Sequence, residues 1–86
     1  MDKIYVAEDD QSNRYFLKKV LVGAGYGVDT FKNGKELLDA LNSCKPDLIV
    51  TDVRMPVMDG FELVDKIREL HRYNYIPIII LSLIHI

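Results

Sequence analysis

The stretch that decides the fold reads DLIVTDVRMPVMDG and runs from Asp47 to Gly60. Its residues 48–51 form an almost unbroken apolar run, which is typical of a strand covered on both faces in a parallel sheet. The run stops at Asp52, and a loop that contains Pro56 follows. Asp59 then begins a helix, because a glutamate three residues later completes a capping-box pattern. The stretch therefore predicts a buried strand, a loop that opens on an acidic residue, and a helix.

The rest of the chain repeats this alternation of apolar runs and helical patterns. We predict further strands at 4–7, 26–31 and 78–81, and helices over 11–23 and from Asn33 to about residue 41. Asp10 is a plausible N-cap of the first helix. The apolar residues that recur at helical spacing are Phe16, Leu17, Val20, Leu21 and Ala24 in the first helix, Leu37, Leu38 and Leu41 in the second, and Phe61, Val64, Ile67 and Leu70 in the third. With short connections and right-handed crossovers, the order βαβαβαβ predicts an α/β fold with a doubly wound parallel sheet and helices on both faces.

Length and composition limit the classes of function. The chain has 86 residues, 49% hydrophobic and 28% charged, which is enough for one domain with a thin core. With 13 acidic against 11 basic residues and no basic run, we expect no nucleic-acid partner for this domain. A single cysteine, Cys44, excludes an internal disulfide framework. Because no stretch resembles a signal peptide or a membrane span, we expect a cytoplasmic protein with no membrane partner.

Polar side chains follow three of the predicted strands. Glu8, Asp9 and Asp10 follow the first, Asp52 the third and Ser82 the fourth. In open α/β sheets, ligands bind beyond the carboxyl ends of the strands. Carboxylates about 4 Å apart repel by about 4 kcal/mol at an effective dielectric constant of 20, so such a cluster needs a cation. Because oxygen ligands suit Mg²⁺ better than zinc or copper, we predict a Mg²⁺ site that Glu8 and Asp9 hold.

Asp52 is the candidate nucleophile of this site. A carboxylate beside a metal ion can attack a phosphoryl group and carry it as an aspartyl phosphate. Asp52 ends the central strand alone, which would give it a fixed position. The alternative, that it is a turn residue before Pro56, stays open on these residues. For Asp10, the role of helix cap is the better interpretation.

Three motifs taken in order carry a family resemblance. They are VAEDD at 6–10, the deciding stretch at 47–60, and PIIILS at 77–82. Together they resemble the receiver domain of two-component response regulators, from residue 3 to about residue 82. The resemblance implies a flavodoxin-like sheet and a signalling domain rather than an enzyme, in a family that slowly hydrolyses its own phosphoryl group. It also implies a sensor histidine kinase or a phosphotransfer protein as the partner that donates the phosphoryl group.

The same resemblance implies a role for single residues. Asp52 matches the phosphoacceptor, Asp9 the direct Mg²⁺ ligand, and Glu8 the acid that usually acts through water. Arg54 would bind the metal through its main-chain carbonyl, and Ser82 falls where receivers contact the phosphoryl group. With Asp52 as a ligand too, the implied Mg²⁺ site has four protein residues.

This sequence lacks the helix, strand and helix that end the receiver fold, and with them a lysine and an aromatic switch residue. We therefore expect residues 1–82 to form a truncated receiver domain. The last six residues can be encoded by codons that look like a transposon-end adapter, so we expect 83–86 to be a non-native or disordered tail. The strand at 78–81 would then be an exposed apolar edge.

The residues also bear on two other functions. A phosphatase of the haloacid-dehalogenase type also uses an aspartate after a strand, but it needs a second aspartate where this chain has Arg54. A pseudo-receiver that acts as an interaction module, or a non-functional fragment, stays open as an alternative.

Overall fold

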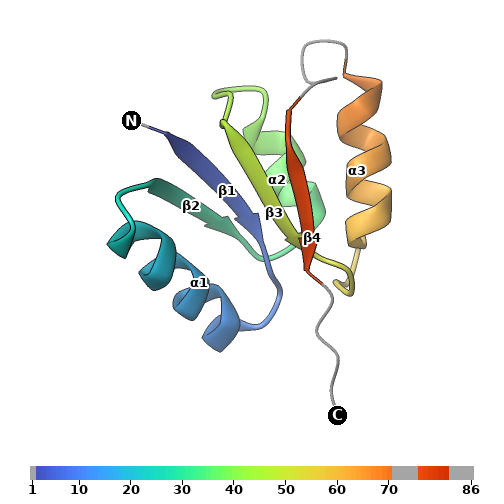
Figure 1. Cartoon of the computed structure of the whole chain (residues 1–86). Coiled ribbons are helices and arrows are strands. Elements are labelled where there is room, and N and C mark those ends of the chain that lie inside the picture. Colours follow the sequence, from blue (N-terminus) through green and yellow to red (C-terminus); the bar gives the residue numbers. More distant parts are fainter. Residues whose placement is uncertain (1, 71–75, 82–86) are drawn as a thin grey trace.

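Figure 1 shows the computed structural model of the chain, which describes residues 2–70 and 76–81. The described elements follow the predicted order βαβαβαβ. They are β1 (Lys3–Ala7), α1 (Gln11–Gly23), β2 (Gly27–Phe31), α2 (Gly34–Ala40), β3 (Leu48–Asp52), α3 (Gly60–Glu69) and β4 (Ile78–Leu81). Ser82 and the predicted tail at 83–86 lie outside the described residues.

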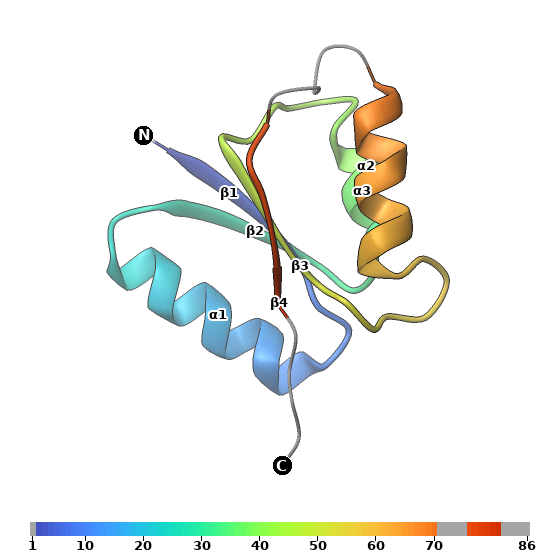
Figure 2. The ribbon, with the colours of Figure 1, turned by 45° about the vertical axis from the view of Figure 1, so that its right-hand side comes forward.

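The four described strands form one parallel sheet in the order β2-β1-β3-β4. β1 and β3 therefore lie in the centre, and β2 and β4 form the edges. Figure 2 shows the layers: α1 covers one face of the sheet, and α2 and α3 cover the other. The predicted α/β fold, a doubly wound parallel sheet of the flavodoxin-like type, is confirmed.

Each described helix begins at the predicted cap. The side-chain oxygens of Asp10, Asn33 and Asp59 accept hydrogen bonds of 2.8 to 2.9 Å from the backbone N–H groups three residues later. Such a bond satisfies a donor that the first helical turn leaves unpaired, and it contributes about 1 kcal/mol. The helix starts are therefore set by local sequence.

The sheet separates two apolar clusters, because successive side chains of a strand point to opposite faces. The larger cluster lies on the side of α2 and α3. It contains Tyr5, Ala7, Leu37, Leu41, Ile49, Met55, Leu63, Ile67 and Ile76. The smaller cluster, which lies toward α1, contains Ile4, Val6, Val28 and Val50. The sheet is thus packed tightly on one side and more thinly on the other.

The apolar residues that recur at helical spacing in α1 do not all face the sheet. Phe16 is 63% exposed and Val20 51% exposed, and none of the residues of α1 is buried. The helix packs on the smaller cluster through Leu17 and Leu21. One helix meets the sheet along a narrow stripe, so residues on the flanks of that stripe stay in solvent.

The apolar stripe predicted for α3 also needs correction. Leu63 and Ile67 are fully buried, whereas Phe61 is 60% exposed. The rotation of the helix is set at its first residue, because Gly60 packs directly on the backbone of Asp52 and Val53. This close contact turns Leu63 into the core and leaves Phe61 on the surface.

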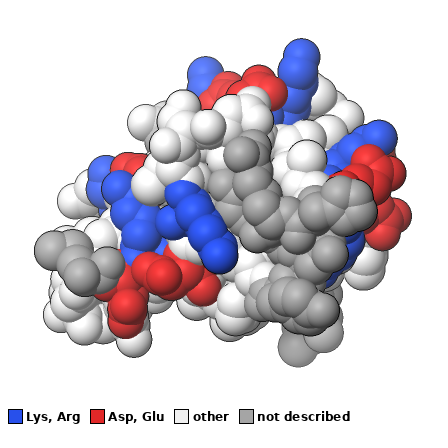
Figure 3. All heavy atoms as spheres, turned by 90° about the horizontal axis from the view of Figure 1, so that it is seen from above, with Lys and Arg blue, Asp and Glu red and all other residues white. Residues whose placement is uncertain are grey.

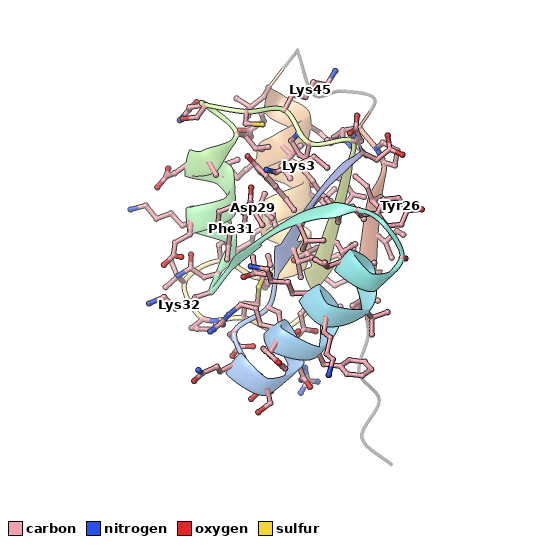
Figure 4. All side chains as sticks on the ribbon, turned by 90° about the vertical axis from the view of Figure 1, so that its left-hand side faces the viewer. Lys3, Tyr26, Asp29, Phe31, Lys32 and Lys45 are labelled. Carbon is pink, nitrogen blue, oxygen red and sulfur yellow. The ribbon has the colours of Figure 1, made fainter. Side chains whose placement is uncertain are left out.

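The two edge strands differ in character. In β4, Ile79 is 49% exposed and the other three residues are only half-buried, which fits an exposed apolar edge. On the opposite edge, Lys3 of β1 and Asp29 of β2 form an ion pair of 2.9 Å, and both are labelled in Figure 4.

Figure 3 looks at the end of the sheet where the strands begin, and there Lys and Arg atoms lie beside Asp and Glu atoms. None of the helices in the described part of the chain is long and apolar enough to cross a membrane.

The orientation of α3 can be tested by two truncations. We expect Ile67→Ala to lower the free energy of unfolding by about 2 to 5 kcal/mol, because it removes a buried side chain and leaves a cavity. Phe61→Ala should change it by about 0.5 kcal/mol or less, as surface substitutions do. Urea unfolding followed by circular dichroism measures both. Equal losses in the two variants would contradict the observed rotation of the helix.

Candidate functional site

The pairing of β1 with β3 brings two acidic residues to the same edge of the sheet. Ala7 lies opposite Thr51 in the parallel register, so Glu8 and Asp52 follow at the same level. Both continue the alternation of the side chains that face α1. Figure 1 shows the ends of β1 and β3 meeting at the lower edge of the sheet, where α1 begins.

Three predicted residues come together there. Glu8, Asp9 and Asp52 each offer a carboxylate oxygen, and these oxygens lie within 4.8 Å of one another. Glu8 is 2% exposed and Asp52 8% exposed, whereas Asp9 is open to solvent. Oxygens bound to one Mg²⁺ at about 2.1 Å lie at most about 4.2 Å apart, so small side-chain adjustments would complete the site. The donor set fits the predicted Mg²⁺, a hard cation that prefers oxygen ligands.

The side chains of Asp10 and Arg54 are not part of this carboxylate cluster. Asp10 acts as the N-cap of α1, as the sequence indicated. Arg54 lines a surface hollow of about 580 Å³ that borders Asp9 and also includes Val53, Met55, Pro56, Asp59 and Phe61. Its main-chain carbonyl stays a predicted metal ligand, and Ser82 lies outside the described residues.

The surroundings of the cluster shift the pKa of Glu8. Burial raises the pKa of this carboxyl from 4.5 to about 7, and the negative charges of Asp52 and Asp9 act in the same direction. The backbone N–H of Asp10 donates a hydrogen bond of 3.1 Å to Glu8 Oε1 and opposes the shift. A proton on Glu8 therefore relieves part of the repulsion among the three acids.

The main chain of Asp52 is held from two directions. The Thr51 hydroxyl donates a hydrogen bond of 3.0 Å to the Asp52 carbonyl oxygen, and Thr51 is itself fully buried. The Gly60 N–H donates to the Val53 carbonyl at 2.9 Å, and a Cβ atom on Gly60 would collide with the Asp52 carbonyl oxygen. Thr51 was not among the predicted site residues. A lone hydroxyl in an otherwise apolar strand, directly before the acid, was the available signal.

The loop after Asp52 contains a strained residue. Val57 has a φ of 74°, in the left-handed region that β-branched residues rarely adopt. The Met58 N–H donates to the Pro56 carbonyl at 2.8 Å, which closes a tight γ-turn around it. This turn directs the chain from β3 to the cap of α3.

Arg14 connects α1 to the acidic loop. One guanidinium nitrogen, Nη1, donates to the main-chain carbonyls of Glu8 at 2.9 Å and of Asp9 at 3.3 Å. Arg14 was not among the predicted site residues, because a contact with main-chain carbonyls leaves no pattern of paired side chains.

Two glycines give a matched test of the close contact at Asp52. We expect Gly60→Ala to destabilise the fold by about 1 to 3 kcal/mol, because the added methyl group forces the backbone apart. Gly23→Ala should stabilise it by about 0.5 to 1 kcal/mol, since no atom lies within 4 Å of the new Cβ and alanine favours the helix. Urea unfolding measures both, and a neutral Gly60→Ala would contradict the contact.

The raised pKa of Glu8 predicts a pH dependence of stability in the absence of metal. Between about pH 4.5 and pH 7, the unfolded state has lost this proton and the folded state still holds it, so stability falls as pH rises through that window. We expect Glu8→Gln to remove this part of the slope. Glu62→Gln, the same change at an exposed position, should leave it. Identical slopes in the Glu8→Gln variant and the unmodified chain would contradict the raised pKa.

Comparisons with known proteins agree with this geometry. A family model described as the response regulator receiver domain matches residues 4–85. The DNA-binding transcriptional regulator NtrC of Escherichia coli K12 is 43% identical over 79 residues, which cover 92% of this chain and 16% of NtrC. Chemotaxis protein CheY4 of Vibrio cholerae matches with a TM-score of 0.89 and 38% identity, over 93% of this chain and 67% of that one. The response regulator TrrA of Thermotoga maritima, solved in complex with Mg²⁺-BeF, matches with a TM-score of 0.85 and 35% identity, over 95% and 70% of the two chains.

This chain thus spans about a sixth of the length of NtrC. The matched residues include all three motifs from which the resemblance was inferred. The chain belongs to the response regulator receiver domain family of two-component signalling.

Proposed function

We propose that Asp52 accepts a phosphoryl group from a histidine of a sensor kinase or a phosphotransfer protein, in a reaction that requires Mg²⁺. The observation that carries this proposal is the position of Asp52 at the end of a central strand. One of its carboxylate oxygens lies within 4.8 Å of oxygens from Glu8 and Asp9. Membership of a family of signalling domains supports it, as does the Mg²⁺-BeF complex of TrrA.

In the proposed transfer, an Asp52 carboxylate oxygen attacks the phosphorus atom. The bond between phosphorus and the donor nitrogen breaks, and its electron pair returns to the imidazole. The product is an aspartyl phosphate. The Thr51 hydroxyl and Gly60 hold the main chain of Asp52, so the nucleophile has a fixed position when the donor arrives.

Four residues would hold the metal: Glu8, Asp9 and Asp52 through their carboxylates, and Arg54 through its main-chain carbonyl. When bound, the ion supplies positive charge that offsets the charge on the phosphoryl oxygens. The surface hollow beside Asp9 gives a donor access to this edge. The contact expected from Ser82 and the cytoplasmic location stay predictions.

The acidic cluster favours phosphoacceptance over the alternative of a pseudo-receiver. A domain that only binds a partner has no need for three clustered carboxylates, where burial and the neighbouring negative charges together raise the pKa of Glu8. Arg54, two positions after the nucleophile, argues against a phosphatase that needs an aspartate there. We assign no separate enzymatic activity to the chain beyond the slow hydrolysis that the family implies.

Labelling with a small phosphodonor such as acetyl phosphate tests the proposal. We expect the intact chain to gain the mass of one phosphoryl group when Mg²⁺ is present, and to gain none when the metal is chelated. Asp52→Asn should abolish the labelling, because an amide oxygen is a poor nucleophile.

The matched control is Asp65→Asn, the same change on the exposed surface of α3, which should label normally. Persistence of the label in Asp52→Asn would sink the assignment of the nucleophile. A chain that binds Mg²⁺ but takes up no label would favour the pseudo-receiver.

A further inference from the structure

We propose that Arg14 is a positioning residue of the metal site. Its guanidinium would fix the loop between β1 and α1 so that Glu8 and Asp9 present their carboxylates to one cation. This inference rests on the proposed function, because it assumes that the acidic cluster binds a metal ion. Arg14 touches neither the metal nor the phosphoryl group in this proposal and acts through the main chain of the two acids.

The contacts of Arg14 join the two acids at their backbone. Nη1 donates to the Glu8 carbonyl at 2.9 Å and to the Asp9 carbonyl at 3.3 Å. Hydrogen bonds from a charged donor are about twice as strong as those between neutral groups. Because Arg14 is half-buried in the first turn of α1, its side chain ties the loop to a regular element.

Other contacts hold the ends of this loop. The Glu8 N–H donates to the Phe31 carbonyl at 3.0 Å, which continues the pairing with β2. At the other end, Asp10 caps α1 and accepts from the Arg14 N–H at 2.9 Å. The guanidinium therefore acts on the segment between two fixed points, where the exposed Asp9 must be held.

Arg14 could affect cation binding through its charge or through its hold on the loop, and the two effects predict opposite changes in cation affinity when Arg14 is replaced. A positive charge close to a cation site weakens cation binding through repulsion, so its removal should tighten binding if charge were its main effect. If placement dominates, removal lets the two carboxylates move apart and binding weakens. Outer contacts of this kind typically change metal affinity by about 10- to 100-fold. The sign of the change therefore separates the two effects.

The choice of metal gives a second readout. Mg²⁺ demands nearly octahedral geometry with bonds of about 2.1 Å, whereas Ca²⁺ accepts flexible geometry at about 2.3 to 2.6 Å. If the loop is no longer held in place, the affinity of the chain for Mg²⁺ should fall more than its affinity for Ca²⁺. A loss of fold stability alone would not change the ratio of the two affinities measured on folded protein.

The experiment is calorimetric titration of the chain with Mg²⁺ and with Ca²⁺, on samples whose fold is checked by circular dichroism. Arg14→Met keeps the aliphatic stem and removes the donors and the charge. We expect it to raise the Kd for Mg²⁺ by about 10-fold or more, and to raise the Kd for Ca²⁺ by less. Arg14→Lys keeps a charged donor and should recover part of the Mg²⁺ affinity.

The matched control is Lys18→Met, which removes one positive charge from an exposed position of the same helix. It should leave both affinities within about 2-fold of the unmodified chain. If Arg14→Met does not fold, Arg14→Gln replaces it, because it removes the same charge and shortens the side chain, and it should raise the Kd for Mg²⁺ in the same direction.

Unchanged or tighter Mg²⁺ binding in Arg14→Met would overturn the inference, and so would equal losses for the two ions. A failure of the proposed function looks different. Phosphoacceptance fails if the unmodified chain binds Mg²⁺ but takes up no phosphoryl label, and the affinities of the Arg14 variants still test the positioning role in that case. An unmodified chain that binds no Mg²⁺ would overturn both.

Discussion

The parallel pairing of β1 with β3 is the constraint on which the rest of the structure depends. It sets Glu8 and Asp52 at one level and on one face of the sheet. A slip of one residue in either strand would turn its side chains to the opposite face and separate the two acids. The register is fixed by the apolar alternation of both strands, with Tyr5, Ala7 and Ile49 on the side of α2 and α3 and with Ile4, Val6 and Val50 on the side of α1. The packing of the core therefore positions these two acids at the edge of the sheet.

That positioning creates an electrostatic problem, which a proton and a cation can each relieve. Without a cation, burial and the neighbouring charges raise the pKa of Glu8 to about 7, so this acid is partly protonated near neutral pH. A bound divalent cation favours the charged form of the same carboxyl, and proton and metal ion then compete. Metal affinity should therefore rise with pH through the region where Glu8 titrates. A cation that binds only the folded chain would also stabilise the fold.

The sequence predicted what depends on local patterns or on the general geometry of parallel sheets. The caps at Asp10, Asn33 and Asp59 follow from residue type and spacing, and the meeting of Glu8, Asp9 and Asp52 follows from the order of the strands. The rotation of α3 was not predictable from periodicity, because Phe61 and Leu63 both fit an apolar stripe. The contact of Gly60 with the Asp52 backbone decides between them. Thr51 and Arg14 were missed because their partners are main-chain carbonyls, and these are present at every residue.

These missed contacts share a property that bears on how the site works. Thr51, Gly60 and Arg14 all act on main-chain atoms of the acidic residues and not on their carboxylates. A hydrogen bond to a charged carboxylate is worth about 1.5 to 3 kcal/mol, and a cation would have to displace any such bond that lay in its way. Support through the main chain avoids that competition. Glu8 departs from this pattern, since one of its oxygens already accepts from the Asp10 N–H. The role through water that the resemblance to receivers implies for Glu8 stays a prediction.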